Sequence, residues 1–363
     1  MKYNTYTLSE LATIKYGKNQ KAVLSEDGNI PIYGTGGLMG YATKPLYDKP
    51  SVLIGRKGTI EKVHYVTHPF WTVDTLFYTI VNEDIIRPHY LYYLLSTLDL
   101  KQYNEGTTIP SLRTDTLNRI EFNVPDLKAQ DDTLSVLEPI EEKIELNNEI
   151  NKNLEQQAQA IFEDEFLSHD EPPHGWCESN LLAIADYLNG LAMQKFRPVE
   201  GESGLPVLKI KELRQGMCDI NSELCSPNIK PEYIVHDGDV IFSWSGSLLV
   251  DFWCGGTCGL NQHLFKVTST RYDKWFYYAW TKHHLSKFIA LAADMATTMG
   301  HIKREELSKA GVLIPPTEDY CRIGSLLQPL YDMIISNRIE NRQLAELRDE
   351  LLPKLMSGEI DLS

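Results

Sequence analysis

Two long stretches of the chain carry apolar residues at the spacing of a helix that packs along one side. The first runs through DDTLSVLEPIEEKIELNNEINKNLEQQAQAIFEDEF, and the second lies near the C-terminus. In both stretches apolar residues recur with a period of about 3.5 residues, which predicts two coiled-coil helices. The predicted seam positions are Leu137, Ile144, Asn147, Asn151 and Leu154 in the first helix, and Leu327, Ile334, Asn337, Asn341 and Leu344 in the second.

The remaining sequence forms two stretches in which short apolar runs, such as SVLIG, are separated by Gly and Pro. Such runs are typical of strands joined by turns. The predicted order is therefore globule, helix, globule, helix, with segments 1–125, 126–170, 171–315 and 316–363. A chain of 363 residues is long enough for two domains of ordinary size.

The two halves of the chain form a diverged internal repeat. GTTIPSL (106–112) matches ATTMGHI (296–302), and SVLIGRKG (51–58) matches DVIFSWSG (239–246). The helices align at the offset of the first match, 190 residues, so Asn147 corresponds to Asn337 and Asn151 to Asn341. Repeats whose helices meet at equivalent positions predict a pseudo-two-fold axis and an antiparallel helix pair.

Two asparagines stand in the middle of each predicted seam. They could face solvent, but their matched positions in both helices favour pairing across the seam. Polar residues buried in a seam fix register and partner at some cost in stability.

The stretch IPIYGTGGLMGYA (30–42) suggests a loop that holds a nucleotide cofactor. Such a loop opens directly into a helix, whose N-terminus binds the phosphate. Here Pro45 and Pro50 follow, and then the strand-like SVLIG, so tight turns between strands are the favoured interpretation. A third interpretation is a loop that lets the backbone approach DNA.

Charge is distributed unevenly along the chain. The net charge is −15, but residues 126–171 alone carry 14 acidic and 3 basic residues. The two globular segments are nearly balanced, so they can hold basic patches that the total conceals.

The six cysteines are scattered, and only Cys254 and Cys258 lie close together. That spacing lacks a second ligand pair, so we expect reduced thiols and no metal. The polar N-terminus and the lack of a long apolar run predict a cytoplasmic protein without a membrane segment.

Several long motifs resemble the specificity subunits of type I restriction–modification systems. IPIYGTGGLMGYATKPLYDKPSVLIGRKGTIEKVHYVTHPFWTVDTLFYTI, and ADYLNGLAMQKFRP followed by LPVLKIKELRQG, resemble target recognition domains. KIELNNEINKNLEQQAQAIFEDEF and NRQLAELRDELLPKLMSGEIDLS resemble the two conserved helices, although the family often has a basic and aromatic stretch where this chain reads EDEF. The resemblance covers essentially the whole chain.

The resemblance implies a mixed α/β fold with two recognition domains, spaced by an antiparallel coiled coil. It implies a non-catalytic subunit that binds a bipartite, asymmetric sequence in double-stranded DNA. It further implies two methyltransferase subunits as partners, which modify adenine with S-adenosylmethionine, and allows restriction subunits that use ATP and Mg²⁺. No cofactor is then expected on this chain.

The sequence lacks the motifs that these partner activities require. Its two Pro-Pro pairs, in EPPHGW and IPPTED, do not fit the (D/N)PP(Y/F/W) loop of an adenine methyltransferase, and no GxxxxGK[ST] is present. The acidic helices could instead dock basic surfaces of partners, or form plain solvated faces. The residues in question are Glu141, Glu142, Glu145, Glu155, Glu163 and Asp164.

Basic, hydroxyl and amide residues at matched positions of the repeat are the candidates for DNA contact. Arg suits guanine edges, whereas Lys, Ser and Thr often contact phosphate. In the first domain they are Tyr33, Thr35, Arg56, Lys57, Thr59, Thr107, Thr108, Ser111 and Arg113. In the second they are Gln194, Lys195, Arg197, Lys209, Lys211, Ser243, Ser245, Thr297, Thr298, His301, Lys303 and Arg304, with Arg214 and Asn261–His263 nearby. Trp71 and Trp244 are expected to anchor loops rather than stack on bases.

A different class of function fits the repeat and the acidic helices equally well. The chain could be a coiled-coil adaptor whose two globules bind other proteins. Sequence-specific DNA binding distinguishes the two hypotheses.

Overall fold

The computed structural model describes residues 3–169, 171–294 and 302–362. It divides into two compact units, one formed by Met1–Glu142 with Glu346–Ser363 and the other by Lys143–Ala345. Two helices of 41 residues, α4 (Leu127–Leu167) and α10 (Thr317–Ser357), each contribute to both units.

The first unit is built on an antiparallel four-stranded sheet of order β2-β8-β5-β6. Its central strand β5 reads SVLIG and is buried throughout, as expected for a strand covered on both faces. Helix α2 begins with Pro88 at its first turn and packs against β5 and β6. The shorter elements are β1 (Tyr3–Thr7), α1 (Leu8–Leu11), β2 (Ala12–Tyr16), β3 (Ile30–Gly34), β4 (Gly37–Ala42), β5 (Ser51–Gly55), β6 (Val63–Val66), β7 (Trp71–Thr72), β8 (Leu76–Val81), α2 (Pro88–Ser96), the 3₁₀ helix η1 (Leu100–Tyr103), α3 (Thr114–Leu117) and β9 (Glu121–Pro125).

The second unit repeats the large sheet and the terminal strand pair of the first. Its sheet β11-β18-β15-β16 matches β2-β8-β5-β6, and the pair β10–β19 matches β1–β9. The shorter elements are β10 (Cys177–Asn180), α5 (Leu181–Ile184), β11 (Asp186–Asn189), the 3₁₀ helix η2 (Met193–Lys195), β12 (Leu205–Leu208), α6 (Ile210–Gln215), β13 (Leu224–Cys225), the 3₁₀ helix η3 (Pro231–Tyr233), β14 (Ile234–Val235), β15 (Val240–Ser243), β16 (Leu249–Phe252), β17 (Cys258–Leu260), β18 (Leu264–Thr268), α7 (Lys274–His283), α8 (Leu285–Asp294), α9 (Arg304–Ser308) and β19 (Gly311–Ile314).

Each unit also holds a smaller sheet that contains one parallel strand pair. In the first unit the order is β4-β3-β7, with β3 and β7 parallel. In the second the order is β13-β12-β17-β14, with β12 and β17 parallel. The glycine-rich stretch forms the β3–β4 hairpin, which has a register shift at Ile32/Tyr33, and the next element is β5. It is therefore a turn between strands and does not lead into a helix.

A glycine at the same place in each unit joins the two sheets. A Cβ on Gly17 would lie 2.0 Å from the Val73 carbonyl oxygen, and one on Gly190 would lie 2.3 Å from that of Asn261. Only glycine allows this approach of backbone to backbone. The end of the large sheet is thus held against the end of the parallel pair in both units.

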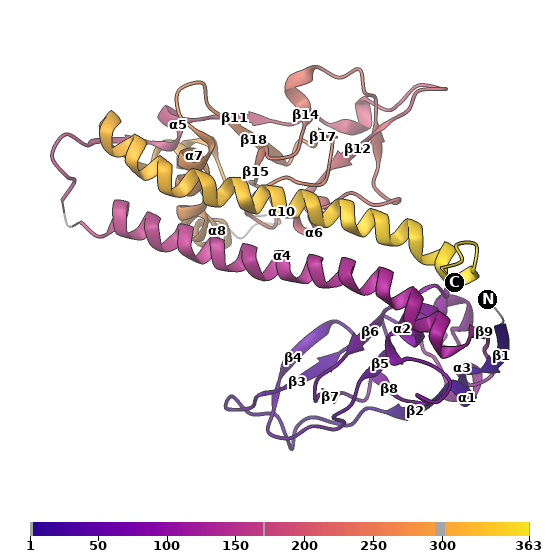
Figure 1. Ribbon diagram of the computed structural model, residues 1–363. Coiled ribbons are helices and arrows are strands. Elements are labelled where there is room, and N and C mark those ends of the chain that lie inside the picture. Colours follow the sequence, from indigo (N-terminus) through magenta and orange to yellow (C-terminus); the bar gives the residue numbers. More distant parts are fainter. Residues whose placement is uncertain (1–2, 170, 295–301, 363) are drawn as a thin grey trace. The chain divides into compact units, whose positions relative to one another are not determined.

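Within the second unit, α4 and α10 run side by side and antiparallel (Figure 1). The Asn147 side-chain amide donates to Asn341 (2.8 Å), and that of Asn337 donates to Asn151 (2.9 Å). Because Asn147 corresponds to Asn337 in the repeat, these two contacts are related by the pseudo-two-fold axis. The predicted fold class, with its paired long helices, is confirmed.

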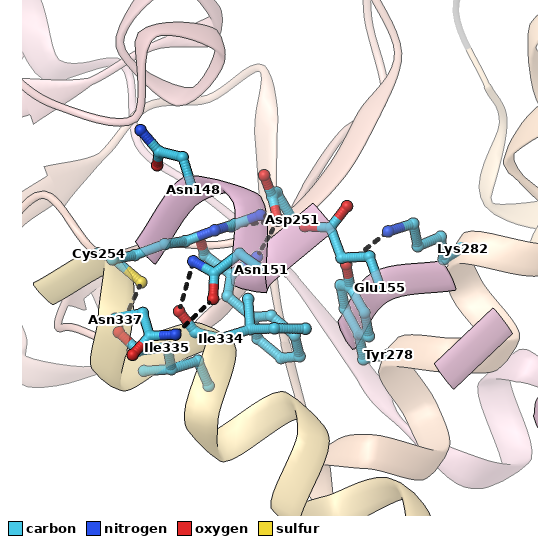
Figure 2. Close-up of polar contacts among 12 residues, drawn as sticks. Asn148, Asn151, Glu155, Asp251, Cys254, Tyr278, Lys282, Ile334, Ile335 and Asn337 are labelled. Atoms are coloured by element: carbon cyan, nitrogen blue, oxygen red, sulfur yellow. Dashed lines mark hydrogen bonds and ion pairs between the residues drawn. The ribbon is translucent and has the colours of Figure 1, made fainter. Parts of the chain in front are cut away.

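The helix pair is fixed to the second unit's sheet by ion pairs. Arg338 on α10 reaches Asp251 on β16 (2.7 Å) and Glu155 on α4 (2.8 Å). Figure 2 shows Glu155 and Asp251 beside the asparagines of the seam. Arg342 extends the contact to Asp237 (2.9 Å).

In the first unit α2 is held to the start of α4 by a histidine. His89 lies 2.8 Å from Glu138 through Nδ1 and 3.0 Å from Glu141 through Nε2. Its ring stacks between Tyr65 and Tyr93. Burial disfavours the charged ring, but the two carboxylates outweigh burial and raise the pKa of His89. Both ring nitrogens donate to these carboxylates when the ring is protonated.

Candidate nucleic-acid interface

The candidate site of the first unit lies at the carboxyl end of its parallel strands. β3 and β7 end side by side, and the Val73 N–H donates to the Tyr33 carbonyl (3.0 Å). Loops that leave the carboxyl ends of parallel strands commonly form binding crevices. Here the two loops are the glycine turn, which includes Thr35, and the segment 73–75.

Two further loops join this edge through the backbone. The N–H of Arg56 donates to the Thr75 carbonyl (2.9 Å), and that of Leu112 donates to the Arg56 carbonyl (2.9 Å). Lys57 also pairs with Ser111. The structure thus brings together predicted residues from sequence positions 33–35, 56–59 and 107–113.

Arg56 is preoriented at this junction. Its guanidinium donates to the Asp74 carbonyl (2.8 Å) and lies 5.0 Å from the centre of the Tyr16 ring. Neither contact neutralises its charge, and the side chain is partly exposed. Lys57 is exposed and has no carboxylate partner among the described residues. Arg56 and Lys57 therefore present positive charge at this edge.

The other candidates of the first unit differ in availability. Thr107 and Thr108 are exposed, and Thr59 is partly exposed. Arg113 is exposed but pairs with Glu105 (3.1 Å). The Tyr33 hydroxyl lies 3.0 Å from His68 Nε2, and burial raises the pKa of Tyr33.

In the second unit the corresponding edge forms a surface groove of about 450 Å³. β12 and β17 end side by side, and the Asn261 N–H donates to the Leu208 carbonyl (3.2 Å). The groove is lined by Met193, Gln194, Arg197, Lys209, Ile210, Lys211, Glu223, Asn261, Gln262 and His263. Four of the predicted residues, from the two segments 194–197 and 209–211, are therefore gathered in one groove beside Asn261–His263.

The cations of this groove are paired with carboxylates. Lys209 Nζ lies 2.6 Å from Glu223, Arg197 Nη2 lies 2.9 Å from the same residue, and Lys211 lies 3.0 Å from Asp219. Hydrogen bonding from Lys209 is the main cause of a lowered pKa at Glu223. Exposed pairs of this kind contribute only about 0–1 kcal/mol to stability. Their main effect is on orientation and local charge.

One matched position shows how the two edges differ. The Ile302 N–H donates to the Trp244 carbonyl (3.0 Å), which reproduces the bond from Leu112 to Arg56. Trp244 therefore occupies the place of Arg56. Its indole donates to Asn189 (3.1 Å), and it is partly buried.

Two of the predicted contact residues, both serines, do not reach the surface in the described structure. Ser243 and Ser245 are buried, and the Ser243 hydroxyl donates to the Ser245 and Ser247 carbonyls. Ser243 therefore stabilises the turn after β15, and neither serine is available to DNA. Trp71 is buried and donates to the Lys18 carbonyl (2.9 Å), as expected of a loop anchor.

The remaining predicted residues lie on the surface or outside the described residues. Lys195, Lys303 and Arg304 are exposed. Thr297, Thr298 and His301 lie outside the described residues.

The acidic helix faces are only partly free. Glu141 bonds His89 and Glu155 bonds Arg338, so both are engaged within their own units. The exposed members are Glu142, Glu145, Glu163 and Asp164.

Sequence reasoning missed the partners that set the charge of the two edges. Tyr16 and Asp74 orient Arg56, whereas Glu223 and Asp219 hold the cations of the second unit. The repeat carried no signal for the last two, because the corresponding loop of the first unit is the glycine hairpin.

Two further features of the described residues bear on other classes of protein. No group of three or more His, Cys, Asp or Glu side chains is placed to hold a metal ion within those ranges. No described helix is both long and apolar enough to cross a membrane.

Comparison with known proteins gives a consistent relationship. A family model for the type I restriction modification DNA specificity domain matches residues 1–156 and 173–348. The specificity subunit of the type I restriction enzyme MjaIX from Methanocaldococcus jannaschii is 25% identical over 347 residues, covering 87% of this chain and 78% of that protein. The HindI specificity subunit of Haemophilus influenzae is 20% identical over a match that covers 80% of this chain and 81% of that protein.

A solved structure shares the fold. The S subunit of a type I restriction–modification system from M. genitalium has a TM-score of 0.64 at 14% identity, covering 98% of this chain and 96% of that one. The family model covers most of the chain in two copies, as the internal repeat requires. This chain therefore belongs to the family of type I restriction–modification DNA-specificity subunits.

Proposed function

We propose that each unit reads one half of a bipartite DNA target through the carboxyl edge of its parallel strands. The observation that carries this proposal is the construction of the same edge twice, with different side chains. Arg56 in one unit is replaced by Trp244 in the other, and the glycine turn is replaced by Lys209 and α6. Because the side chains differ, the two half-sites differ, and the target is asymmetric.

The chain supplies recognition, and its partners supply chemistry. We infer that two methyltransferase subunits bind the complex and transfer a methyl group from S-adenosylmethionine to adenine. Restriction subunits, with ATP and Mg²⁺, can add cleavage. The chain itself then needs no cofactor, in keeping with a glycine stretch that forms a hairpin rather than a strand-to-helix turn. The adaptor hypothesis is not favoured, because a DNA-specificity family model and relatives named as specificity subunits cover most of the chain.

The exposed acidic residues of α4 are the surface that we assign to partner docking. Glu142 and Glu145 lie near the middle of the helix, and Glu163 and Asp164 lie near its end. A partner with a basic surface would be attracted to them by charge complementarity.

Methylation mapping tests the proposal. The chain is co-expressed with its methyltransferase subunit in a host that lacks other adenine methylation, and N6-methyladenine is mapped across the genome. We expect a single asymmetric motif of two short parts separated by a fixed gap. Assembly of the complex without new methylation would contradict the proposal.

A further inference from the structure

A single acidic side chain lies in the groove of the second unit. Among the residues that line it within the described ranges, Glu223 alone is acidic. Its two oxygens are divided between two cations, Oε1 accepting from Lys209 and Oε2 lying beside Arg197. The carboxylate remains 41% exposed, so it also faces whatever enters the groove.

Glu223 is held in place by the backbone around it. Its carbonyl accepts from the Val207 N–H (2.8 Å), and the next residue, Leu224, pairs with Pro206 in the β12–β13 ladder. Lys209 leaves the end of the same strand β12. Strand pairing therefore brings Glu223 close to Lys209.

A carboxylate in this position favours one kind of DNA contact over another. A phosphate that approaches Lys209 or Arg197 meets the negative charge of Glu223 and must displace it. The exocyclic amino groups of adenine and cytosine are donors, and a carboxylate with two occupied acceptor sites still has others free. In the first unit Arg56 bonds a carbonyl, and of the candidate cations there only the exposed Arg113 pairs with a carboxylate among the described residues, that of Glu105.

We propose that Glu223 is a specificity-determining residue that directs this groove to base edges and repels backbone phosphate. Residues that repel the wrong partner raise specificity as effectively as those that attract the right one. The inference rests on the proposed function and adds to it a division of labour. Both edges read bases, but the first edge can add more phosphate contacts, whereas the second edge depends more on its base contacts.

The test compares Glu223→Gln with a matched control. Glu178→Gln makes the same change at an exposed glutamate on β10 that does not line the groove. Each variant is assembled with the methyltransferase subunit, and its affinity is measured over a range of salt concentrations. The duplexes are the mapped target and versions in which the first or the second half is replaced.

We expect Glu223→Gln to bind the duplex with a replaced second half about fivefold more tightly, the scale of an exposed ion pair. The slope of the logarithm of its binding constant against the logarithm of salt concentration should become more negative by about one, as expected for one added phosphate contact. Methylation should spread to sites that match only in the first half. Glu178→Gln should behave as wild type, and Glu223→Asp, which keeps the charge, should retain discrimination.

Three results would overturn the inference. One is unchanged discrimination and salt slope in a folded Glu223→Gln complex. Another is loss of discrimination in Glu223→Asp equal to that in Glu223→Gln, which would assign the residue a packing role. A wild-type complex that binds all duplexes equally would instead refute the proposed function, and the inference with it.

Discussion

The asparagine pair Asn151–Asn337 gives a prediction that can be worked out in magnitude. Both side chains are at most 7% exposed between α4 and α10. The Asn337 amide donates to Asn151 (2.9 Å), and the Asn151 amide reaches the Ile334 carbonyl (3.4 Å), as Figure 2 shows. Each asparagine therefore depends on the helix opposite for its hydrogen bond.

Replacing one partner should cost more than replacing both. Asn151→Leu leaves the buried amide of Asn337 without its acceptor, a loss of about 1–3 kcal/mol that added apolar burial offsets in part. We expect a net loss of about 1–2 kcal/mol for each single variant. The double leucine variant leaves no buried amide without a partner, so it should be at least as stable as wild type. Because the two single losses sum to at least about 2 kcal/mol, the coupling energy between the two positions should be at least about 2 kcal/mol.

Denaturant unfolding followed by tryptophan fluorescence measures this cycle. Five of the six tryptophans lie in the second unit, so the signal reports on the unit that holds the pair. The double variant should also lose register specificity and form mixed oligomers in size-exclusion chromatography. Single losses that simply add in the double variant would show that the two side chains do not interact, and the reasoning would fail.

Three further predictions concern pH, recognition and spacing. The pKa of His89 is raised in the folded state, so its contribution to stability is complete below about pH 6.5 and is lost as pH rises through the folded-state pKa. The melting temperatures of wild type and His89→Gln should therefore converge as pH rises. A constant difference between them at all pH values would contradict this. Arg56→Ala should weaken binding by about 1–3 kcal/mol and relax the methylation motif in one half only, with exposed Arg119→Ala as the control; relaxation in both halves would indicate a scaffold effect. We would insert seven residues after position 149 and seven after position 339, which lie midway between the asparagine contacts. Each helix then becomes about 10 Å longer, and the gap between the two DNA half-sites should widen by about three base pairs. An unchanged gap would refute a spacing role for the helices.

The features that the sequence predicted correctly are those that periodicity and repetition encode. A seam of apolar residues has a fixed period, so the two long helices and their pairing could be predicted from positions such as Leu137 and Leu327, both fully buried in the structure. The repeat also aligned Arg56 with Trp244, and the structure places these two residues at equivalent positions of the two units.

Features that depend on loop conformation could not be predicted in this way. Ser243 looks like an exposed donor in SWSGS, but its hydroxyl turns inward to two carbonyls of its own turn. Glu223 lies 14 residues from Lys209 in sequence and meets it only because β12 and β13 form a hairpin. Side-chain pairing across irregular loops leaves no period in the sequence, so the candidate site was only partly predictable.

The division between a constant scaffold and variable edges explains how one fold can read many sequences. The close approaches at Gly17 and Gly190, and the matched bonds from Leu112 and Ile302, fix the backbone of each edge. Side chains on that backbone that lie at the surface, such as Lys57, can change at little cost in stability. Arg56 and Trp244 differ in this way between two copies within one chain, although Trp244 also packs against the core of its unit. A change of DNA target should therefore require substitutions only at the strand ends and their loops, and leave the seam of the paired helices untouched.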